Sequence, residues 1–202
     1  KQALGISVTA GRSLRMKPRW CASYKHVTVR PIEEDDIEKL RLWRNDQEIK
    51  RFLSPIPEIT KEMQQDWYHS YLKDPNIITY AIDERSELNR MVGTVSLYDF
   101  EGVIARAGKI IIGDPAARGK NMGFWGESLA LYIGYQKMGI SQFRAEVHEK
   151  NISSQKMHQK LGFHCVGKHK FDAFGFEDDF ILNKDFFEKI HDFLPEVRLF
   201  EL

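Results

Sequence analysis

The spacing of apolar and polar residues divides the first third of the chain into one strand and two helices. Residues 26–30 alternate apolar and polar side chains and are rich in β-branched residues, which predicts a strand. An acidic run at residues 33–36 comes before apolar residues at helical spacing, so we expect a helix to start near Ile37, with negative charge at its positive end. Thr60 is well placed to cap a second helix.

Strand patterns dominate the middle of the chain, and strands and helices alternate after it. Three apolar runs separated by polar turns, Ile77–Asp83, Met91–Asp99 and Ala107–Asp114, predict an antiparallel meander. The later elements are a helix over Phe124–Met138, a strand over Gln142–His148, a helix that Asn151 or Ser153 caps and that runs to Leu161, a hairpin over residues 165–183 and a C-terminal helix over residues 185–194.

This order of elements predicts an α+β fold, in which about four helices flank a central mixed, mostly antiparallel β-sheet of about seven strands. A chain of 202 residues is long enough for one domain with a sizeable core. Residues 1–24 are basic and show little apolar periodicity, so we expect an arm or tag there and assign residues 25–202 to the domain. An organelle transit peptide would share this basic composition, but it would also show an amphipathic stripe.

Charge and cysteine content narrow the class of protein. Lysine and arginine number 30 against 29 for aspartate and glutamate, so no overall field attracts a polyanion and we expect no nucleic-acid partner. No apolar run approaches the roughly 20 residues that cross a bilayer, so no membrane is expected. Cys21 and Cys165 are too few for a disulfide framework, which favours a reducing, cytoplasmic setting. No Cys/His cluster has metal-ligand spacing, so the sequence predicts no metal.

The most informative segment is an apolar strand followed by a turn with Arg and Gly and then a long helix. This arrangement aims several backbone N–H groups and a helix N-terminus at one point, which suits a phosphate. Gly119 and Gly123 allow close approach, Arg118 can pair with a phosphate, and Asn121 tolerates a left-handed backbone. The segment matches neither the Walker A motif nor the dinucleotide GxGxxG motif. The alternative is a purely structural turn.

Two motifs carry a family resemblance. Arg118–Gly123, with the sequence RGKNMG, resembles the R/Q-x-x-G-x-G/A loop with which GNAT proteins hold the pyrophosphate of coenzyme A. Asn151–Phe163 is similar to the family segment that begins with Asn and ends in K-L-G-F, and one helix and one strand separate the two motifs as in the family. The similarity covers roughly Val27 to Lys184. It implies the GNAT fold, acetyl-CoA as cosubstrate and acetyl transfer to a primary amine.

The resemblance also assigns residues to the coenzyme, with three departures from the family pattern. The central glycine of the loop is Asn121, the tyrosine that many members place before Leu-Gly-Phe is His158, and the Glu found early in the strand before the loop is Gly108. The coenzyme contacts that the resemblance implies are Ile110, Ile111, Ile112, Arg118, Gly119, Lys120, Asn121, Met122, Gly123, Asn151 and Ser154.

Acetyl transfer needs a base for the amine and help for the departing thiolate. An alkylammonium has a pKa of about 10, so a carboxylate must remove a proton. The candidates are Glu146, Glu149 and Asp99; we favour Glu149 or Asp99, and the alternative is that both are solvated loop carboxylates. His158 takes the position of the family's general acid, and its ordinary pKa near 6.5 suits that role. Its alternative is a half-exposed helix histidine. Backbone N–H groups of residues 109–112 are expected to meet the oxyanion.

Two further segments bear on the acceptor of the acetyl group. Residues 40–45 (LRLWRN) and the late GFEDDF segment look most like the ribosomal-protein and nucleotide-amino-sugar branch of the family, so an amino-sugar nucleotide is the first expectation. The alternatives are a protein N-terminus as acceptor and a non-catalytic acyl-CoA-binding module. The sequence leaves the oligomeric state open, and a homodimer is compatible with it. The predicted substrate contacts are Trp43, Arg44, Asn45 and Asp179.

Overall fold

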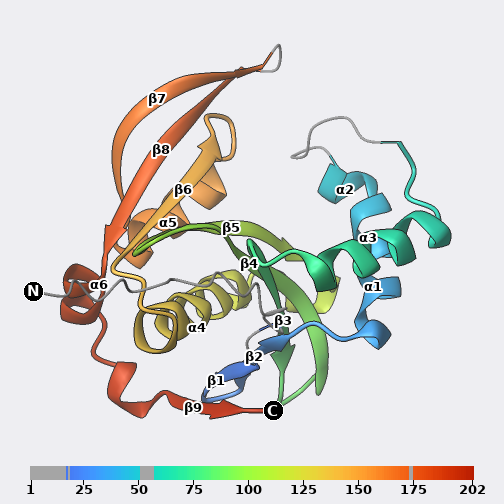
Figure 1. Cartoon of the computed structure of the whole chain (residues 1–202), viewed down its shortest axis with the longest axis horizontal. Helices are drawn as coiled ribbons and strands as arrows, with labels where there is room; N and C mark the ends of the chain where they lie inside the picture. Colours follow the sequence, from blue (N-terminus) through green and yellow to red (C-terminus); the bar gives the residue numbers. More distant parts are fainter. Residues whose placement is uncertain (1–16, 18, 51–56, 173–174) are drawn as a thin grey trace, which may run out of the picture.

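The computed structural model describes residues 17, 19–50, 57–172 and 175–202, and within them nine strands form one sheet (Figure 1). The strand order is β7-β8-β6-β5-β4-β3-β2-β1-β9, and neighbours in this sheet are antiparallel apart from the parallel pair β5 and β6. The strands are β1 (Trp20–Tyr24), β2 (Val27–Pro31), β3 (Ile77–Glu84), β4 (Arg90–Glu101), β5 (Ile104–Ile112), β6 (Gln142–His148), β7 (His164–Asp172), β8 (Gly175–Asn183) and β9 (Arg198–Glu201).

Helices cover both faces of the sheet. The fold class predicted from the sequence is confirmed, although the structure has more strands and helices than expected. Thr60 caps α3 as predicted, since its side chain accepts a hydrogen bond from the Met63 N–H. The helical segments are η1 (Glu34–Asp36), α1 (Ile37–Asn45), α2 (Gln47–Lys50), α3 (Lys61–Lys73), η2 (Pro115–Ala117), α4 (Met122–Lys137), α5 (Ile152–Leu161), α6 (Lys184–Ile190) and η3 (Leu194–Glu196).

Adjacent residues of β3 show how the two faces are divided. Ile82 packs against α4, while Ala81 belongs to the apolar cluster of α1 and α3, because successive side chains of a strand point to opposite faces. α4 lies close to its face of the sheet: a Cβ added at Gly126 would come within 2.3 Å of the Ile82 side chain, and one at Gly134 within 2.4 Å of Phe143. The start of α4 is therefore held in a fixed place beneath the sheet.

The two strands at one end of the sheet, β1 and the edge strand β9, were missed by the sequence pattern. Trp20–Tyr24 fall within the segment expected to be an arm, yet they form β1, which pairs with β2 and with β9. Cys21 and Ala22 are fully buried in this pairing, so burial comes from strands that are distant in sequence rather than from a local pattern. The remainder of the expected arm, residues 1–16 and 18, lies outside the described residues.

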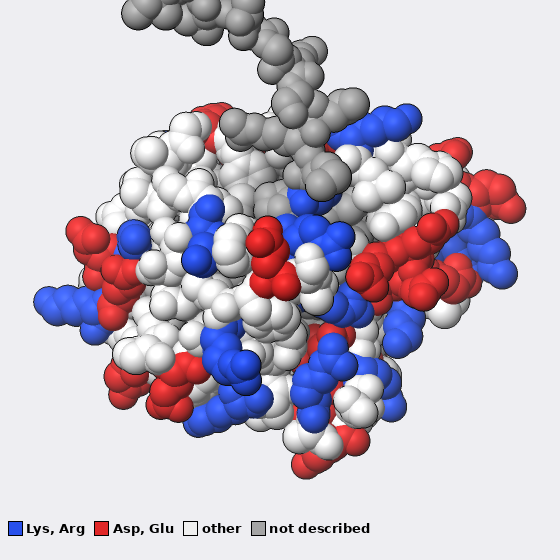
Figure 2. All heavy atoms as spheres, turned by 60° about the horizontal axis from the view of Figure 1, so that its bottom comes forward, with Lys and Arg blue, Asp and Glu red and all other residues white. Residues whose placement is uncertain are grey.

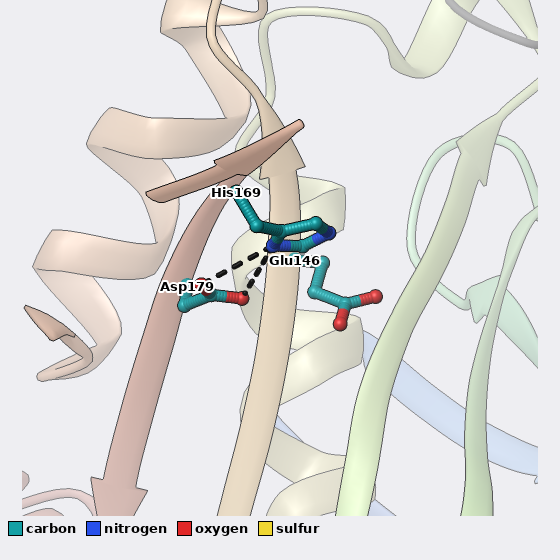
Figure 3. A group of neighbouring side chains, drawn as sticks. All are labelled: Glu146, His169 and Asp179. Carbon is teal, nitrogen blue, oxygen red and sulfur yellow. Dashed lines mark hydrogen bonds and ion pairs between the residues drawn. The ribbon is translucent and has the colours of Figure 1, made fainter. Parts of the chain in front are cut away.

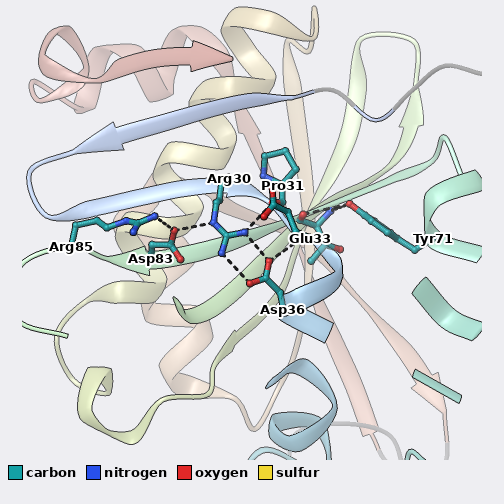
Figure 4. A network of polar contacts seen from close by, with 8 residues as sticks. Arg30, Pro31, Glu33, Asp36, Tyr71, Asp83 and Arg85 are labelled. Carbon is teal, nitrogen blue, oxygen red and sulfur yellow. Dashed lines mark hydrogen bonds and ion pairs between the residues drawn. The ribbon is translucent and has the colours of Figure 1, made fainter. Parts of the chain in front are cut away.

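A buried ion network fixes α1 to the sheet (Figure 4). Arg30 of β2 donates hydrogen bonds to both Asp36 carboxylate oxygens, at 2.7 and 3.0 Å, and its Nε donates to Asp83 of β3 at 3.0 Å. The Asp36 and Asp83 side chains are only 9% and 2% exposed, so their charges need compensation: Arg30 pairs with both, and Arg85 also pairs with Asp83. The network holds the start of α1 over β2 and β3.

The surface carries both signs of charge. Figure 2 shows basic and acidic side chains interspersed over the face that it displays, in keeping with a formal net charge of +1. Among the residues that the structure describes, no helix is long and apolar enough to cross a membrane.

Candidate active site

The parallel strands β5 and β6 pair over a short length and then part. Their register runs from Ile104 opposite Gln142 to Arg106 opposite Arg144, and in the described chain the pairing ends there. On its other side β5 carries a bulge: Ser96 lies opposite Gly108 but Thr94 lies opposite Ile111, and Lys109 has a positive φ of 51°. A bulge bends the strand that contains it. The end of β5 therefore leaves β6, and its backbone polar groups on that side are free to pair with a ligand.

A cavity of about 650 Å³ lies beside this end of β5. It is bounded by the end of β5, the turn before α4, the start of α4, one face of α5 and two residues of α2. Every coenzyme contact expected from the sequence lines the cavity except Lys120, whose Nζ instead lies 2.7 Å from Glu87 Oε2. Lys120 follows Gly119 in the turn, but its side chain points to the β3–β4 connection and not into the cavity.

The turn before α4 is shaped for an anion. Asn121 has the left-handed conformation expected of it, with φ 58° and ψ 21°, and its side chain does not cap the helix. A Cβ added at Gly119, where φ is 76°, would meet nothing within 4 Å, so the space in front of the turn is open. The first N–H groups of a helix have no acceptor within it, and Met122 and Gly123 at the start of α4 line the cavity. A pyrophosphate suits this set of donors.

One face of α5 supplies side chains that the sequence analysis missed. Asn151 caps α5 as predicted, with its Oδ1 accepting the Ser154 N–H at 3.1 Å, and it also lines the cavity. The other cavity residues of α5 lie three, four and seven positions after Ser153. Positions so spaced share one face of a helix, so helical spacing would have identified them. The missed residues on this face are Ser153, Lys156, Met157 and Lys160, and Glu48, Ile49, Ala117 and Phe124 complete the lining.

His158 lies on α5 but turns away from the cavity. It is only 3% exposed; its Nδ1 lies 2.8 Å from the Ser154 carbonyl oxygen and its Nε2 lies 3.4 Å from Oε1 of the fully buried Glu127 of α4. Burial alone would lower the pKa of His158, but the Glu127 carboxylate raises it and the net change is upward. The half-exposed histidine of the alternative interpretation is wrong, and a buried His–Glu pair takes its place.

The face of the sheet opposite α4 carries a polar network at the point where β5 and β6 part. Arg106 of β5 forms an ion pair through Nη1 with Glu146 of β6, and its Nε lies 3.5 Å from an Asp99 carboxylate oxygen. The Asp99 side chain is 57% exposed and lies at the margin of this network. Glu149 lies beyond the end of β6 and pairs with Lys168 Nζ at 2.7 Å, a hydrogen bond that lowers the pKa of Glu149. Glu146 is thus the candidate base nearest to the parting strands.

Two further side chains extend this network across the sheet (Figure 3). The Nδ1 atom of His169 on β7 lies 3.1 and 3.2 Å from the two carboxylate oxygens of Asp179 on β8. Polar atoms of Glu146, His169 and Asp179 all lie within 4.8 Å of one another. A divalent cation needs three such donors, but Arg106 already pairs with Glu146 and Asp179 already pairs with His169. We therefore interpret the group as a hydrogen-bonded network.

The residues expected to contact the acceptor have different surroundings. Trp43 packs against Gly113, where an added Cβ would come within 1.9 Å of the indole. The Asn45 side chain bonds both backbone polar groups of Ile59 at 2.9 Å, so its amide holds α1 to the segment before α3. Arg44 is partly buried, which lowers its pKa, and its charge also acts on Lys109 in the bulge of β5. Of these three residues, Arg44 has the side chain most available to a ligand.

Comparison with known proteins agrees with this geometry. Residues 26–164 match the family model described as acetyltransferase (GNAT) domain. An N-acetyltransferase 9-like protein of Caenorhabditis briggsae is 28% identical over 147 residues, which cover 67% of this chain and 73% of the relative. The human alpha/beta-tubulin-N-acetyltransferase 9 is 25% identical over 154 residues, 70% of this chain and 74% of its own. The branch expected from the sequence, that of ribosomal-protein and amino-sugar acetyltransferases, is not supported by these relatives.

Solved structures share the same fold. A domain from Methanocaldococcus jannaschii superposes with a TM-score of 0.65 at 29% identity, covering 78% of this chain and 97% of that one. The spermidine N-acetyltransferase of Vibrio cholerae, in complex with CoA and spermine, gives a TM-score of 0.72 at 15% identity and covers 81% and 98%. Because the family model spans well over half of the residues, this chain belongs to the acetyltransferase (GNAT) domain family and is an acetyl-CoA-dependent N-acetyltransferase.

Proposed function

We propose that the acceptor is a primary amino group of a polypeptide, with a protein N-terminus as the first choice. The exposure of the acceptor face carries this proposal: the side chains of Glu146 and Asp179 are 28% and 35% exposed, and that of Asp99 is 57% exposed. An amine at the end of a polypeptide can reach a face that is open to solvent. The tubulin acetyltransferase name of the human relative supports a protein acceptor.

An amino-sugar nucleotide is the second candidate acceptor. A nucleotide diphosphate needs cations on the acceptor side, and Arg44 and Lys109 are two partly buried cations there; the Arg44 charge lowers the pKa of Lys109. Lys109 Nζ already lies 4.1 Å from the centroid of the Tyr98 ring. A polypeptide with an acidic side chain near its N-terminus would use the same two cations, so they do not exclude the first proposal.

We assign the general base to Glu146 in place of Glu149 or Asp99. The acceptor ammonium, with a pKa of about 10, must lose a proton before it can attack. Glu146 lies two residues past the last β5–β6 pair, on the face that carries the acceptor network, and Arg106 fixes its orientation. Glu149 is held by Lys168, and Asp99 is more exposed than Glu146, so both are less well placed.

Acetyl-CoA would supply the acetyl group as a thioester, held by the cavity residues described above. The backbone N–H groups of residues 109–112, freed by the parting of β5 from β6, are suited to stabilise the oxyanion. We retain His158 as the proton source for the thiolate, because Glu127 favours its protonated form. The His158 ring does not line the cavity. In this role its proton would therefore have to reach the thiolate from Nδ1 by way of Ser154, which contacts that nitrogen.

The test is acetyl-CoA consumption, followed as free thiol release, across a panel of acceptors. The panel holds N-terminal peptides with acidic and neutral second residues, lysine peptides blocked at the N-terminus, spermidine, an aminoglycoside, and 3-amino and 4-amino sugar nucleotides. We expect the highest kcat/KM for an N-terminal peptide. A preference for a sugar nucleotide would replace the first proposal by the second. Coenzyme binding without turnover of any amine would favour the non-catalytic binding module.

A further inference from the structure

The chemistry of amide formation leaves one proton to be removed from the acceptor face. The ammonium nitrogen carries three hydrogens and the amide nitrogen keeps one, so two protons leave the nitrogen in each turnover. The thiolate that departs takes up one of them in the net reaction, and the other must reach solvent. A base that keeps this proton cannot serve the next turnover. The site therefore needs an exit for a proton from Glu146.

His169 lies where such an exit would begin. Its polar atoms and those of Glu146 lie within 4.8 Å, a separation that one water can bridge, and its side chain is 41% exposed compared with 28% for Glu146. An ionised Asp179 can only accept hydrogen bonds, so it selects the imidazole tautomer with the proton on Nδ1. The Nε2 lone pair is then free to take a proton, as in a His held by a buried carboxylate.

We propose that His169, oriented by Asp179, receives the proton from Glu146 and releases it to solvent. The N–H bond that forms at Nε2 replaces the O–H bond of the protonated Glu146, and the N–H bond at Nε2 then breaks as water takes the proton, so no other reactant is needed. This step rests on the proposed role of Glu146. His169 acts through Glu146 and not on the acceptor, which makes it a positioning and relay residue.

The charges around His169 come from β8 and β6, with Arg106 of β5 beyond them. Asp179 and Glu177 face it from β8, with Glu177 Oε2 at 3.8 Å from Nε2, and Glu146 faces it from β6, where Arg106 balances its charge. The neighbouring Lys168 points to the other face, toward Glu149 and Asp178. The hydrogen bond to Asp179 is the main cause that raises the pKa of His169 above its ordinary value, and the charges of Asp179, Glu146 and Glu177 add to it.

The pH dependence of kcat tests this relay. Neutral His169 is the form that accepts the proton, so kcat rises as pH rises through the His169 pKa. Asp179→Asn removes the largest cause of the raised pKa of His169, and we expect the acid limb of the profile to move to lower pH. A purely structural role for Asp179 would lower kcat without moving this limb. His164 is an exposed histidine at the start of β7, and His164→Asn is the matched control that keeps the profile unchanged.

Chemical rescue gives the second measurement. We expect His169→Ala to lower kcat at pH 7 by about tenfold or more, to leave the KM for acetyl-CoA unchanged, and to recover several-fold with added imidazole. Circular dichroism establishes that the variant is folded. A folded His169→Ala enzyme with the wild-type kcat and pH profile would overturn the relay while leaving the acetyltransferase proposal intact. Loss of turnover that imidazole cannot restore would also overturn it. If the wild-type protein acetylates no amine of the panel, the proposed acceptor chemistry itself is wrong.

Discussion

The proposed coenzyme side and the proposed acceptor side of this enzyme are built in different ways. The coenzyme side is formed by backbone from one continuous stretch, the end of β5 through the start of α4, and by one face of α5. The acceptor side is formed by side chains from four strands, β5 to β8, with α1 and α3 over the neighbouring part of the same face. Backbone donors tolerate many substitutions, but a side-chain network changes with each residue. The acceptor side is therefore where this fold can change its substrate.

The largest effect that separates the two sides is expected at Glu146. Glu146→Gln keeps the shape of the side chain but removes the base, so we expect kcat to fall by about 10² to 10⁴-fold while the Kd for coenzyme A stays the same. Thiol release and calorimetric titration measure the two quantities. Glu149→Gln is the matched control on the same chain segment, with an expected change in kcat of less than about threefold. The reverse ranking would return the role of base to Glu149.

The next effect concerns the anchor of α1. Arg30→Ala removes the cation that Asp36 and Asp83 share and leaves Asp83 with its Arg85 pair, and we expect the free energy of unfolding to fall by about 3 kcal/mol. Urea unfolding at pH 7 measures this loss. Lys120 pairs with Glu87 at the surface, where both side chains are exposed, so Lys120→Ala is the control and should change stability far less. Equal losses in the two variants would show that the buried network contributes no more to the free energy of unfolding than a surface ion pair does.

A smaller effect, confined to the coenzyme side, is expected at the phosphate turn. Within the described part of the chain, the Arg118 side chain makes only long contacts, at 3.5 Å to the Ile112 carbonyl oxygen and 3.6 Å to Asp46, and so it is available to a phosphate. We expect Arg118→Ala to raise the KM for acetyl-CoA about tenfold with little change in kcat. Lys120→Ala, two residues away, removes a lysine that pairs with Glu87 and should raise this KM less than twofold. A larger effect at Lys120 would contradict the placement of its side chain.

The smallest expected effect is a pH dependence of stability from the buried His158–Glu127 pair. The pKa of His158 is raised in the folded protein. The stabilisation that its pair with Glu127 gives is therefore complete below the unfolded pKa of about 6.5 and is lost as pH rises through the folded pKa. We expect the free energy of unfolding to decrease with pH above neutrality in the wild type, and less steeply in Glu127→Gln. Urea unfolding from pH 5.5 to 8.5 measures both slopes. Identical slopes would mean that the pair does not titrate as proposed.

The difference between the coenzyme side and the acceptor side also explains how much of the fold and of the site could be predicted from the sequence. The turn at Arg118–Gly123 and the α5 cap at Asn151 depend on residues that are adjacent in sequence, so their geometry follows from local conformational preferences. The parting of β5 from β6 depends on a bulge at Gly108 and Lys109 whose consequence appears only in the strand register. His169 was missed because its contact with Asp179 depends on register shifts within the β7–β8 hairpin.

Strands β1 and β9 pair with Trp20 opposite Glu201, which brings positions 181 residues apart in sequence side by side. In the strand order, β9 lies five strand spacings from β5, roughly 24 Å at about 4.8 Å per spacing. A short linker between these positions would make a circularly permuted enzyme, and a surface attachment at this edge would hold the molecule with its reaction face clear. The edge of the sheet at β1 and β9 is thus a suitable attachment site for immobilisation and for single-molecule measurements.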